Sequence, residues 1–357
     1  MWPGRPIAAV SRIYCEVDDT DGAIGDVASA LAEAHLDACR AACPGPAQTA
    51  DWLVEHLLGD LNNAADIALS EYEDVLGKAG LARVHELVVT AWRANPKCWA
   101  EKHLMEQLTR AEGSPDALIA VHAADLAPSG ATHLVIAREL ERAGHPAEAL
   151  EWAERGLRES DPDRGPDQHL VDFVCERYTR SGRPADVVVV RRDVLRRRRT
   201  LASYQDLRTA ARGADRWDEP ERAQALNVLR ADSRPRKCLG PLGSVLVDAL
   251  LDDGDNEAAW KAATDGYADY RQWLTLADRS RDTRPVDSLS VYLRLIGPLL
   301  TRTGDAAYEQ LTELLLSVRA CHQALGAHDT FTDYMASLRT TQKRKRKLMA
   351  LLDGHGL

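Results

Sequence analysis

The chain has 357 residues, a formal net charge of -10 and a pI near 5.6. This balance excludes a protein that coats nucleic acid along its whole surface, because such binding needs a broad basic face that displaces counterions. Hydrophobic residues make up 45% of the chain but aromatic residues only 5%, so Leu, Ala and Val must supply most of the core. That composition favours close-packed helices.

The first third of the chain predicts helices after a short N-terminal arm. Residues 7–17 lack helical periodicity and favour a strand or an extended segment, which we place at 1–20. Amphipathic stretches follow, and most of them stop at Gly or Pro, residues that end helices because of the left-handed cap and the missing N–H. The region 21–128 is predicted to contain helices at 24–42, 47–58, 64–78, 81–94, 99–111 and 115–126.

The middle region, 129–266, predicts helical hairpins that recur. Gly144-His145-Pro146 separates a helix at 131–143 from one at 146–159, and Gly182-Arg183-Pro184 separates 167–181 from 185–199. Gly254 separates 241–252 from 256–263, and a weaker pair lies within 201–231, interrupted at Gly213 and at the turn 217–220. The β-branched run 187–190 would favour a strand in isolation, but its place in a hairpin predicts a helix.

The last region, 267–357, predicts longer helices at 270–282, 285–302, 306–325 and 330–352. A hairpin of two helices cannot bury its apolar stripe alone, so successive copies must stack on one another. The sequence therefore predicts an all-α fold, an α-solenoid of stacked antiparallel hairpins that runs through the three helical regions as one continuous body.

The hairpins resemble tetratricopeptide repeats. In 144–157, Ala149, Ala153 and Gly156 occupy the small positions at which the second helix of that repeat packs on the first. In the next unit Cys175 and Tyr178 match the small and aromatic positions of the first helix. Gly144 and Gly182 are 38 residues apart (182 − 144), against about 34 in the family, and no unit carries the full consensus. The resemblance is therefore to a TPR-like repeat.

Nearly the whole chain also resembles the helical region C-terminal to the zinc module of bacterial SWIM-type zinc-finger proteins. The resembling segments are 17–22, 72–77 with 80–83, 257–260 and 343–352. The zinc module of that family, Cys-x-Cys followed by Cys-x-His, is absent from this sequence, because no two of its seven cysteines are two residues apart. The resemblance thus implies the repeat region alone, without the zinc or DNA-binding role of the module.

One helix face carries metal-ligand residue types. His35, Cys39 and Cys43 follow one another at spacings of four. Eight residues span about 12 Å of helix, so His35 and Cys43 are too far apart to share an ion. We expect these cysteines to be small apolar side chains packed between helices.

A second pattern is similar to part of a calcium loop. Asp19, Asp21 and Gly22 match its middle, but Val17 and Ala28 occupy its first and last ligand positions. A helix N-cap by Asp21 explains the residues more simply.

No catalytic signature is present. The sequence has no Gly-rich phosphate loop that ends in Lys-Ser or Lys-Thr, and no Gly-x-Ser-x-Gly elbow. We therefore expect no enzyme, no cofactor and no metal, although a deep pocket with convergent titratable groups would revive an enzyme. No apolar run approaches the ~20 residues that span a bilayer, the start of the chain lacks an apolar leader, and the cysteines are scattered. These features predict a cytoplasmic protein without a membrane partner.

The resemblance to tetratricopeptide repeats implies a ligand surface on the concave face, which the first helix of each pair lines. The register of the three hairpins places there Arg138, Glu141, Asp172, Glu176 and Asp248. This mainly acidic set predicts a partner protein or peptide that carries Lys or Arg. The predicted function is a non-catalytic protein-interaction scaffold.

Two basic runs supply the alternative function, a nucleic-acid-associated accessory protein. They comprise Arg196, Arg197, Arg198 and Arg199, preceded by Arg191-Arg192, and Lys343, Arg344, Lys345, Arg346 and Lys347. Successive residues of a helix point nearly all the way round it, so such a run makes no flat phosphate-binding stripe. The simpler interpretation is a solvated helix end, where cations are stabilised by the negative pole of the helix dipole.

Overall fold

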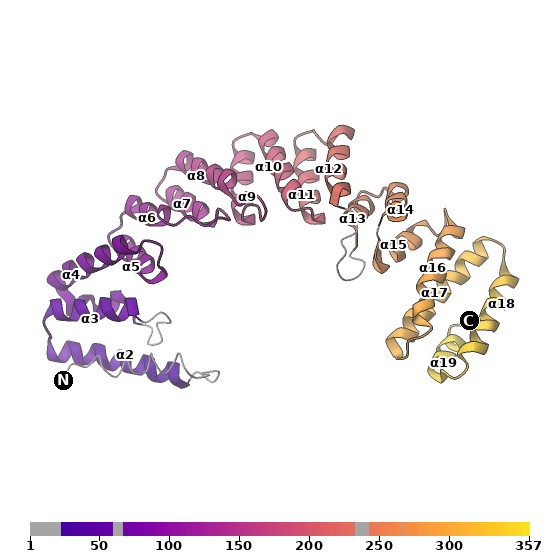
Figure 1. The fold of residues 1–357 in the computed structure, drawn as a ribbon, viewed down its shortest axis with the longest axis horizontal. Helices are drawn as coiled ribbons and strands as arrows, with labels where there is room; N and C mark the ends of the chain where they lie inside the picture. The colour runs from indigo at the N-terminus through magenta and orange to yellow at the C-terminus, as the bar shows by residue number, and fades with distance from the viewer. Residues whose placement is uncertain (1–22, 60–66, 233–242, 267) are drawn as a thin grey trace. The chain divides into compact units, whose positions relative to one another are not determined.

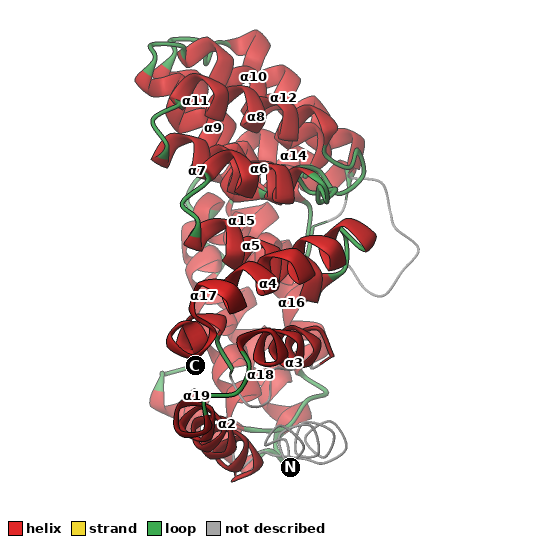
Figure 2. Ribbon diagram, turned by 90° about the vertical axis from the view of Figure 1, so that its left-hand side faces the viewer, coloured by secondary structure: helices red, strands yellow, loops and turns green. Residues whose placement is uncertain are grey.

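The computed structural model describes residues 23–59, 67–232, 243–266 and 268–357. These residues form α-helices and one 3-10 turn, and no strand occurs among them (Figure 2). The predicted all-α class is confirmed. The arm predicted at 1–20, the calcium-like residues Asp19, Asp21 and Gly22, and the SWIM-like segment 17–22 lie outside the described residues.

The chain divides into two compact units, Met1–Arg177 and Tyr178–Leu357, here called unit 1 and unit 2. The helices of unit 1 are α2 (Ala23–Ala42), α3 (Pro46–Gly59), the 3-10 turn η1 (Leu69–Tyr72), α4 (Glu73–Ala94), α5 (Trp99–Ala111), α6 (Pro115–Ala123), α7 (Ala131–Arg142), α8 (Pro146–Glu159) and most of α9 (Gln168–Arg180). The helices of unit 2 are α10 (Pro184–Arg197), α11 (Leu201–Gly213), α12 (Glu219–Asp232), α13 (Val245–Asp252), α14 (Asn256–Asp265), α15 (Tyr270–Ser280), α16 (Pro285–Leu299), α17 (Asp305–Ala324), α18 (His328–Gln342) and α19 (Arg346–Gly354). The predicted division into 21–128, 129–266 and 267–357 stays a prediction.

Within each unit the helices pack on their neighbours in the chain (Figure 1). Consecutive helices make extensive contacts, both within a hairpin, as for α7–α8, and between successive hairpins, as for α10–α11 and α16–α17. Next-but-one helices, such as α3–α5, α11–α13 and α17–α19, are also in contact. Such nearest-neighbour packing defines a stack of helical hairpins. The predicted solenoid of antiparallel pairs is confirmed within each unit.

One turn recurs between the helices of a pair. After α7, Gly144 adopts a left-handed φ of 87°, its N–H donates to the Glu141 carbonyl at 3.0 Å, and the His145 N–H donates to the Leu140 carbonyl at 2.9 Å. Glycine suits this position because a Cβ would be strained there. The same turn closes α5, α9, α13 and α17 at Gly113, Gly182, Gly254 and Gly326.

The weaker predicted pair, α11–α12, uses this turn without glycine. Helix α11 ends at Gly213, as predicted, but the left-handed residue is Asp215, with a φ of 53°. The Arg216 N–H then donates to the Ala211 carbonyl at 2.7 Å. Asp tolerates this conformation better than most residues because its short polar side chain can hydrogen-bond locally.

Three further helix predictions have clear outcomes. The run 187–190 lies inside α10, which confirms the helix. The helix predicted at 64–78 is wrong in part, since the described residues before Glu73 form only an extended segment and the 3-10 turn. The single helix predicted at 330–352 is also wrong, because the chain breaks between Gln342 and Arg346 into α18 and α19.

Small residues let α7 and α8 approach closely. Ala149 and Ala153 are fully buried on α8, and Gly156 is buried beside them. A Cβ at Gly156 would lie 2.7 Å from the His133 Cβ and 2.9 Å from the Leu170 Cδ2. These positions pack as the resemblance to tetratricopeptide repeats implies.

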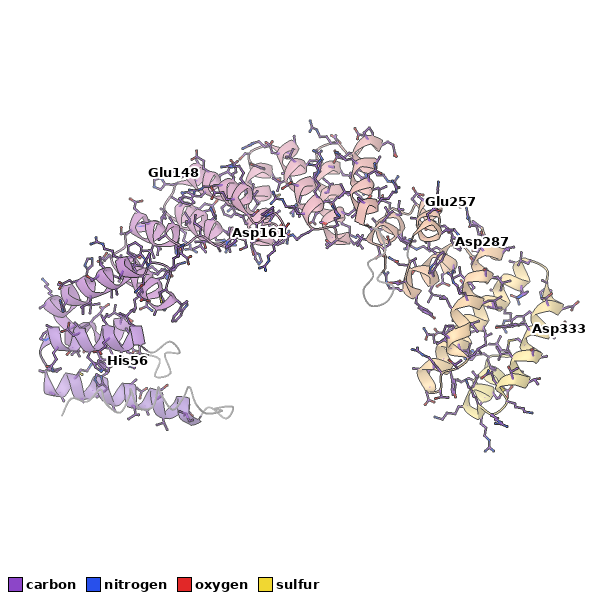
Figure 3. The ribbon with its side chains drawn as sticks, viewed as in Figure 1. His56, Glu148, Asp161, Glu257, Asp287 and Asp333 are labelled. Atoms are coloured by element: carbon purple, nitrogen blue, oxygen red, sulfur yellow. The ribbon has the colours of Figure 1, made fainter. Side chains whose placement is uncertain are left out.

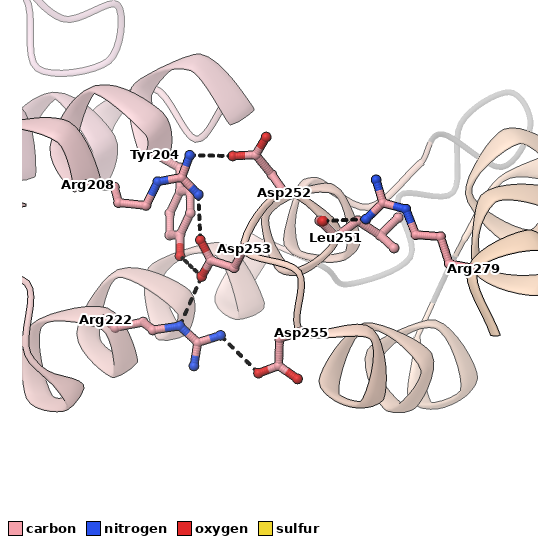
Figure 4. A network of polar contacts seen from close by, with 8 residues as sticks. All are labelled: Tyr204, Arg208, Arg222, Leu251, Asp252, Asp253, Asp255 and Arg279. Atoms are coloured by element: carbon pink, nitrogen blue, oxygen red, sulfur yellow. Dashed lines mark hydrogen bonds and ion pairs between the residues drawn. The ribbon is translucent and has the colours of Figure 1, made fainter. Parts of the chain in front are cut away.

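A buried carboxylate ties three segments of unit 2 together (Figure 4). The Asp253 side chain, 6% exposed, follows α13 and accepts hydrogen bonds from the Tyr204 hydroxyl at 2.7 Å, from Arg208 at 2.6 Å and from Arg222 at 2.9 Å. Each arginine also has a second carboxylate, Asp252 for Arg208 at 2.6 Å and Asp255 for Arg222 at 3.0 Å. The network fixes α11 and α12 to the turn between α13 and α14.

Candidate protein-interaction face

Three first helices of unit 1 leave one stripe each in solvent. Helices α5, α7 and α9 lie along one side of unit 1 in Figure 1, and α6 packs on both α5 and α7. Helices α4 and α6 pack on α5, α6 and α8 pack on α7, and Leu170 of α9 lies beside Gly156 of α8. We infer that the exposed residues of the three helices share the remaining side. We call this surface the α5–α7–α9 face and define it by Trp99, His103, Val135, Arg138, Asp172 and Glu176.

An arginine joins α7 to α9 at the edge of this face. Arg177 donates two hydrogen bonds to the Glu141 carboxylate, at 2.8 and 2.6 Å, and one to Glu176 at 2.6 Å. Its guanidinium also lies over the Phe173 ring, 3.7 Å from the ring centroid. The hydrogen bonds to Glu141 raise the pKa of Arg177, so the arginine stays charged and offsets part of the predicted acidity.

The structure brings four of the five predicted groove residues onto unit 1. Arg138 and Glu141 are one helical turn apart on α7, and Asp172 and Glu176 are one turn apart on α9. Asp172 is exposed and accepts a hydrogen bond from the Gln168 side chain at 3.0 Å.

The fifth predicted residue, Asp248, lies on α13 in unit 2. Arg271 of α15 donates to both of its carboxylate oxygens, at 2.7 and 3.0 Å. Its charge therefore already has a partner within unit 2, and Asp248 is not part of the α5–α7–α9 face.

Sequence reasoning missed the apolar members of the face. Trp99 begins α5, and His103 follows one turn later. The sequence signal was a tryptophan at the start of a predicted helix, but its exposure depends on which sides of α5 the neighbouring helices cover. The exposure of Val135 was not predicted either, because an apolar residue of an amphipathic helix is more often part of the core.

The first basic run is largely paired inside unit 2. Arg191 donates to Asp206 at 3.2 Å, Arg197 lies 3.0 Å from Asp193, and Arg192 donates twice to Glu221, at 2.9 and 2.6 Å. Only Arg196 of the run 196–199 is exposed, since Arg197, Arg198 and Arg199 are half-buried. These arginines fasten α10 to α11 and α12.

The second basic run spans the turn between α18 and α19 and the first two residues of α19, so its assignment to one helix was wrong. The Lys345 ammonium donates to the carbonyls of Leu300 and Arg302, at 2.6 and 2.9 Å, just beyond the C-terminus of α16. A cation is stabilised there by unpaired carbonyls and by the helix dipole. Lys347 pairs with Asp305 at 2.9 Å, while Lys343, Arg344 and Arg346 are exposed.

The His35 face of α2 is an aromatic core in unit 1. His35 is 3% exposed; its Nδ1 lies 2.9 Å from the Tyr72 hydroxyl, and its ring centroid lies 4.0 Å from that of Trp52. Cys39 is buried beside it, as predicted, whereas Cys43 is exposed, so the prediction of a packed thiol was wrong there. In the part of the chain that the structure describes, no group of three or more His, Cys, Asp or Glu side chains is arranged to hold a metal ion.

Acid is expected to weaken this core through His35. Burial, with a smaller contribution from the charge of His56, lowers the pKa of His35 to about 4. Because the unfolded chain has the ordinary value near 6.5, the stabilisation is complete above about pH 6.5 and is lost as the pH falls through about 4. We expect a loss approaching about 1.4 kcal/mol per pH unit in that window.

Thermal unfolding, followed by circular dichroism across this pH range, measures the effect. The control is His35→Gln, which removes the titration and keeps a polar side chain near Tyr72. The wild type should lose stability more steeply than the variant on acidification, because the carboxylates titrate in both. Parallel curves would assign the acid sensitivity to other groups.

No helix in the described part of the chain combines the length and the apolar character needed to cross a membrane.

Comparisons with known proteins do not place this chain in a family. No family model and no curated protein matches the sequence. Among solved structures, a chain from a human IFIT1 dimer with PPP-AAAA is similar over 94% of this chain and 94% of that one, at 10% identity and a TM-score of 0.23. At that TM-score the likeness carries no argument about the site or the ligand.

Proposed function

We propose that this protein is a non-catalytic scaffold that binds a partner protein or peptide on the α5–α7–α9 face. The observation that carries the proposal is the exposure of one stripe on each of three successive first helices. A rigid row of helices with an exposed apolar, aromatic and charged stripe is suited to hold an extended segment, because little of its own conformational entropy is lost on binding.

The charges of the face favour a partner that carries Lys or Arg. Asp172 and Glu176 are exposed on α9, and the Glu176 side chain is half exposed although Arg177 contacts it. Arg138 is an exposed cation of the α7 stripe, and Arg142, one turn later, is another, so the α7 stripe limits how acidic the face becomes. Complementary charges at the rim of an interface mainly accelerate association and make it sensitive to salt.

Neutralising the α9 carboxylates is expected to weaken basic-peptide binding by about tenfold, roughly 1.4 kcal/mol. The variant is Asp172→Asn with Glu176→Gln, and the probe is a fluorescein-labelled peptide of alternating glycine and lysine. Fluorescence anisotropy titration of the full chain measures the dissociation constant, at low and at physiological salt. The difference between the two proteins should shrink as salt is added, because exposed charges are screened.

A matched control comes from the second helix of the same hairpin. Glu148 and Glu151 are exposed on α8, and Figure 3 shows Glu148 on the α8 side of unit 1. Glu148→Gln with Glu151→Gln changes the net charge equally but leaves the α5–α7–α9 face intact. Equal weakening by the two double variants would mean that only net charge matters and would reject the assigned face.

A further inference from the structure

Trp99 is an exposed aromatic residue on α5, whose other large apolar side chains are buried or half-buried. It is 59% exposed at the first residue of α5. One face of its indole stacks on His103, with the ring centroids 5.1 Å apart and an angle of 7° between the planes. The His103 Nε2 in turn lies 2.9 Å from the Gln107 side-chain nitrogen, which favours one ring orientation. The result is a flat platform, two stacked rings thick.

Six other aromatic rings within the described residues have one of the chain's own arginines over them. Arg177 lies over Phe173 at 3.7 Å, and Arg183 lies over Tyr178 at 4.2 Å. Further guanidiniums lie over Trp152, Tyr204, Trp260 and Trp273. Among the described residues, no arginine or lysine lies over Trp99, whose ring stacks on His103. Its outer face is open to a group from outside.

We propose that Trp99 receives an arginine side chain of the partner peptide, stacked flat on the indole. This inference rests on the proposed function, since it names a residue type that the α5–α7–α9 face selects. A guanidinium is planar and weakly hydrated, so it stacks on an aromatic ring while its edge donates hydrogen bonds. The compact ammonium of lysine is more strongly hydrated, and the geometry fits it less well.

The negative charge of the chain favours an arginine side chain over a nucleobase, although a nucleobase also stacks on tryptophan. A nucleotide would bring phosphates to a chain of net charge -10, and the same face carries the exposed carboxylates of Asp172 and Glu176. Those carboxylates repel phosphate but attract the remaining cations of a basic peptide. The observations therefore favour an arginine-containing peptide over single-stranded RNA.

The test compares labelled peptides of alternating glycine with arginine, lysine or neutral citrulline, titrated against the full chain. We expect the arginine peptide to bind about three- to fivefold more tightly than the lysine peptide. Trp99→Ala should weaken arginine-peptide binding more than lysine-peptide binding and so remove this preference, whereas Trp99→Phe should keep part of it. Val286→Ala, which truncates an exposed apolar residue of unit 2, should change nothing.

The outcomes separate this inference from the proposed function. Equal affinities for the two cationic peptides, unaffected by Trp99→Ala but weakened by Asp172→Asn with Glu176→Gln, would overturn arginine stacking and leave the interaction face standing. Absence of binding by either cationic peptide would overturn both. If oligouridylate bound more tightly than the arginine peptide, and Trp99→Ala abolished that binding, the ligand of Trp99 would be single-stranded RNA and not a peptide.

Discussion

Replacing Asp253 with Ala is expected to lower the free energy of unfolding of unit 2 by about 3 kcal/mol. The substitution leaves the buried Tyr204 hydroxyl without its acceptor and removes one carboxylate from each of two half-buried arginines. Leaving a buried donor without a partner costs about 1–3 kcal/mol by itself. Arg208 and Arg222 each keep a second carboxylate, so the expected loss lies at the lower end for a broken buried ion pair.

The protonation of Asp253 gives the same network a pH dependence. Burial raises the pKa of this carboxyl, but the hydrogen bonds from Tyr204, Arg222 and Arg208 together outweigh burial and leave the pKa below its ordinary value. Because the folded pKa is the lower one, the stabilisation is present above the unfolded pKa near 3.9. It is lost as the pH falls through the folded value. The Asp253→Ala variant should therefore differ most from the wild type at neutral pH.

Urea unfolding and hydrogen exchange locate the effect. Exchange should accelerate in α11, α12 and α13, while α3 to α8 of unit 1 keep their protection. The matched control is Asp252→Ala, which removes a more exposed carboxylate that contacts Arg208 alone, and it should cost less than about 1 kcal/mol. Equal losses in the two variants would show that the burial of Asp253 adds nothing to the network.

Much of the fold was predictable because the residues that end and begin its helices act locally. The turns at Gly144 and Gly182, each followed two residues later by Pro, predicted α7, α8, α9 and α10 to within a few residues. A left-handed residue and a proline at the first helical turn act on their own few residues, whatever surrounds them. The β-branched run 187–190 could be assigned to a helix for the same reason, since the flanking turns fixed its context.

The break between α18 and α19 was not predictable, because nothing local requires it. The segment contains neither Gly nor Pro, and its turn is held instead by Lys345, which donates to carbonyls of residues more than forty positions earlier in the chain. The interaction face shows the same limit. Helical periodicity placed Glu141 and Glu176 on the first helices, but the arginine that joins them, Arg177, reaches Glu141 only once α7 and α9 are packed.

Gly156 allows α8 to approach α7 and α9 closely, because it has a hydrogen atom where other residues have a side chain. In an exposed helix, Gly→Ala stabilises by up to about 1 kcal/mol, because glycine loses more conformational freedom on folding. At Gly156 the new Cβ would lie 2.7 Å from the His133 Cβ and 2.9 Å from the Leu170 Cδ2, so α7 or α9 must shift. We expect overpacking to prevail, with a net destabilisation of about 1–3 kcal/mol, and more for Gly156→Leu.

Thermal unfolding of Gly156→Ala beside Gly213→Ala tests this balance. Gly213 is the exposed last residue of α11, and a Cβ there would meet nothing within 4 Å, so its variant should be neutral or slightly stabilised. Opposite signs from the same chemical change would show that close helix approach, rather than backbone freedom, requires Gly156. A stabilised Gly156→Ala would mean that α7 and α8 separate at little cost, and the hairpins would then not be held by close contact at this position.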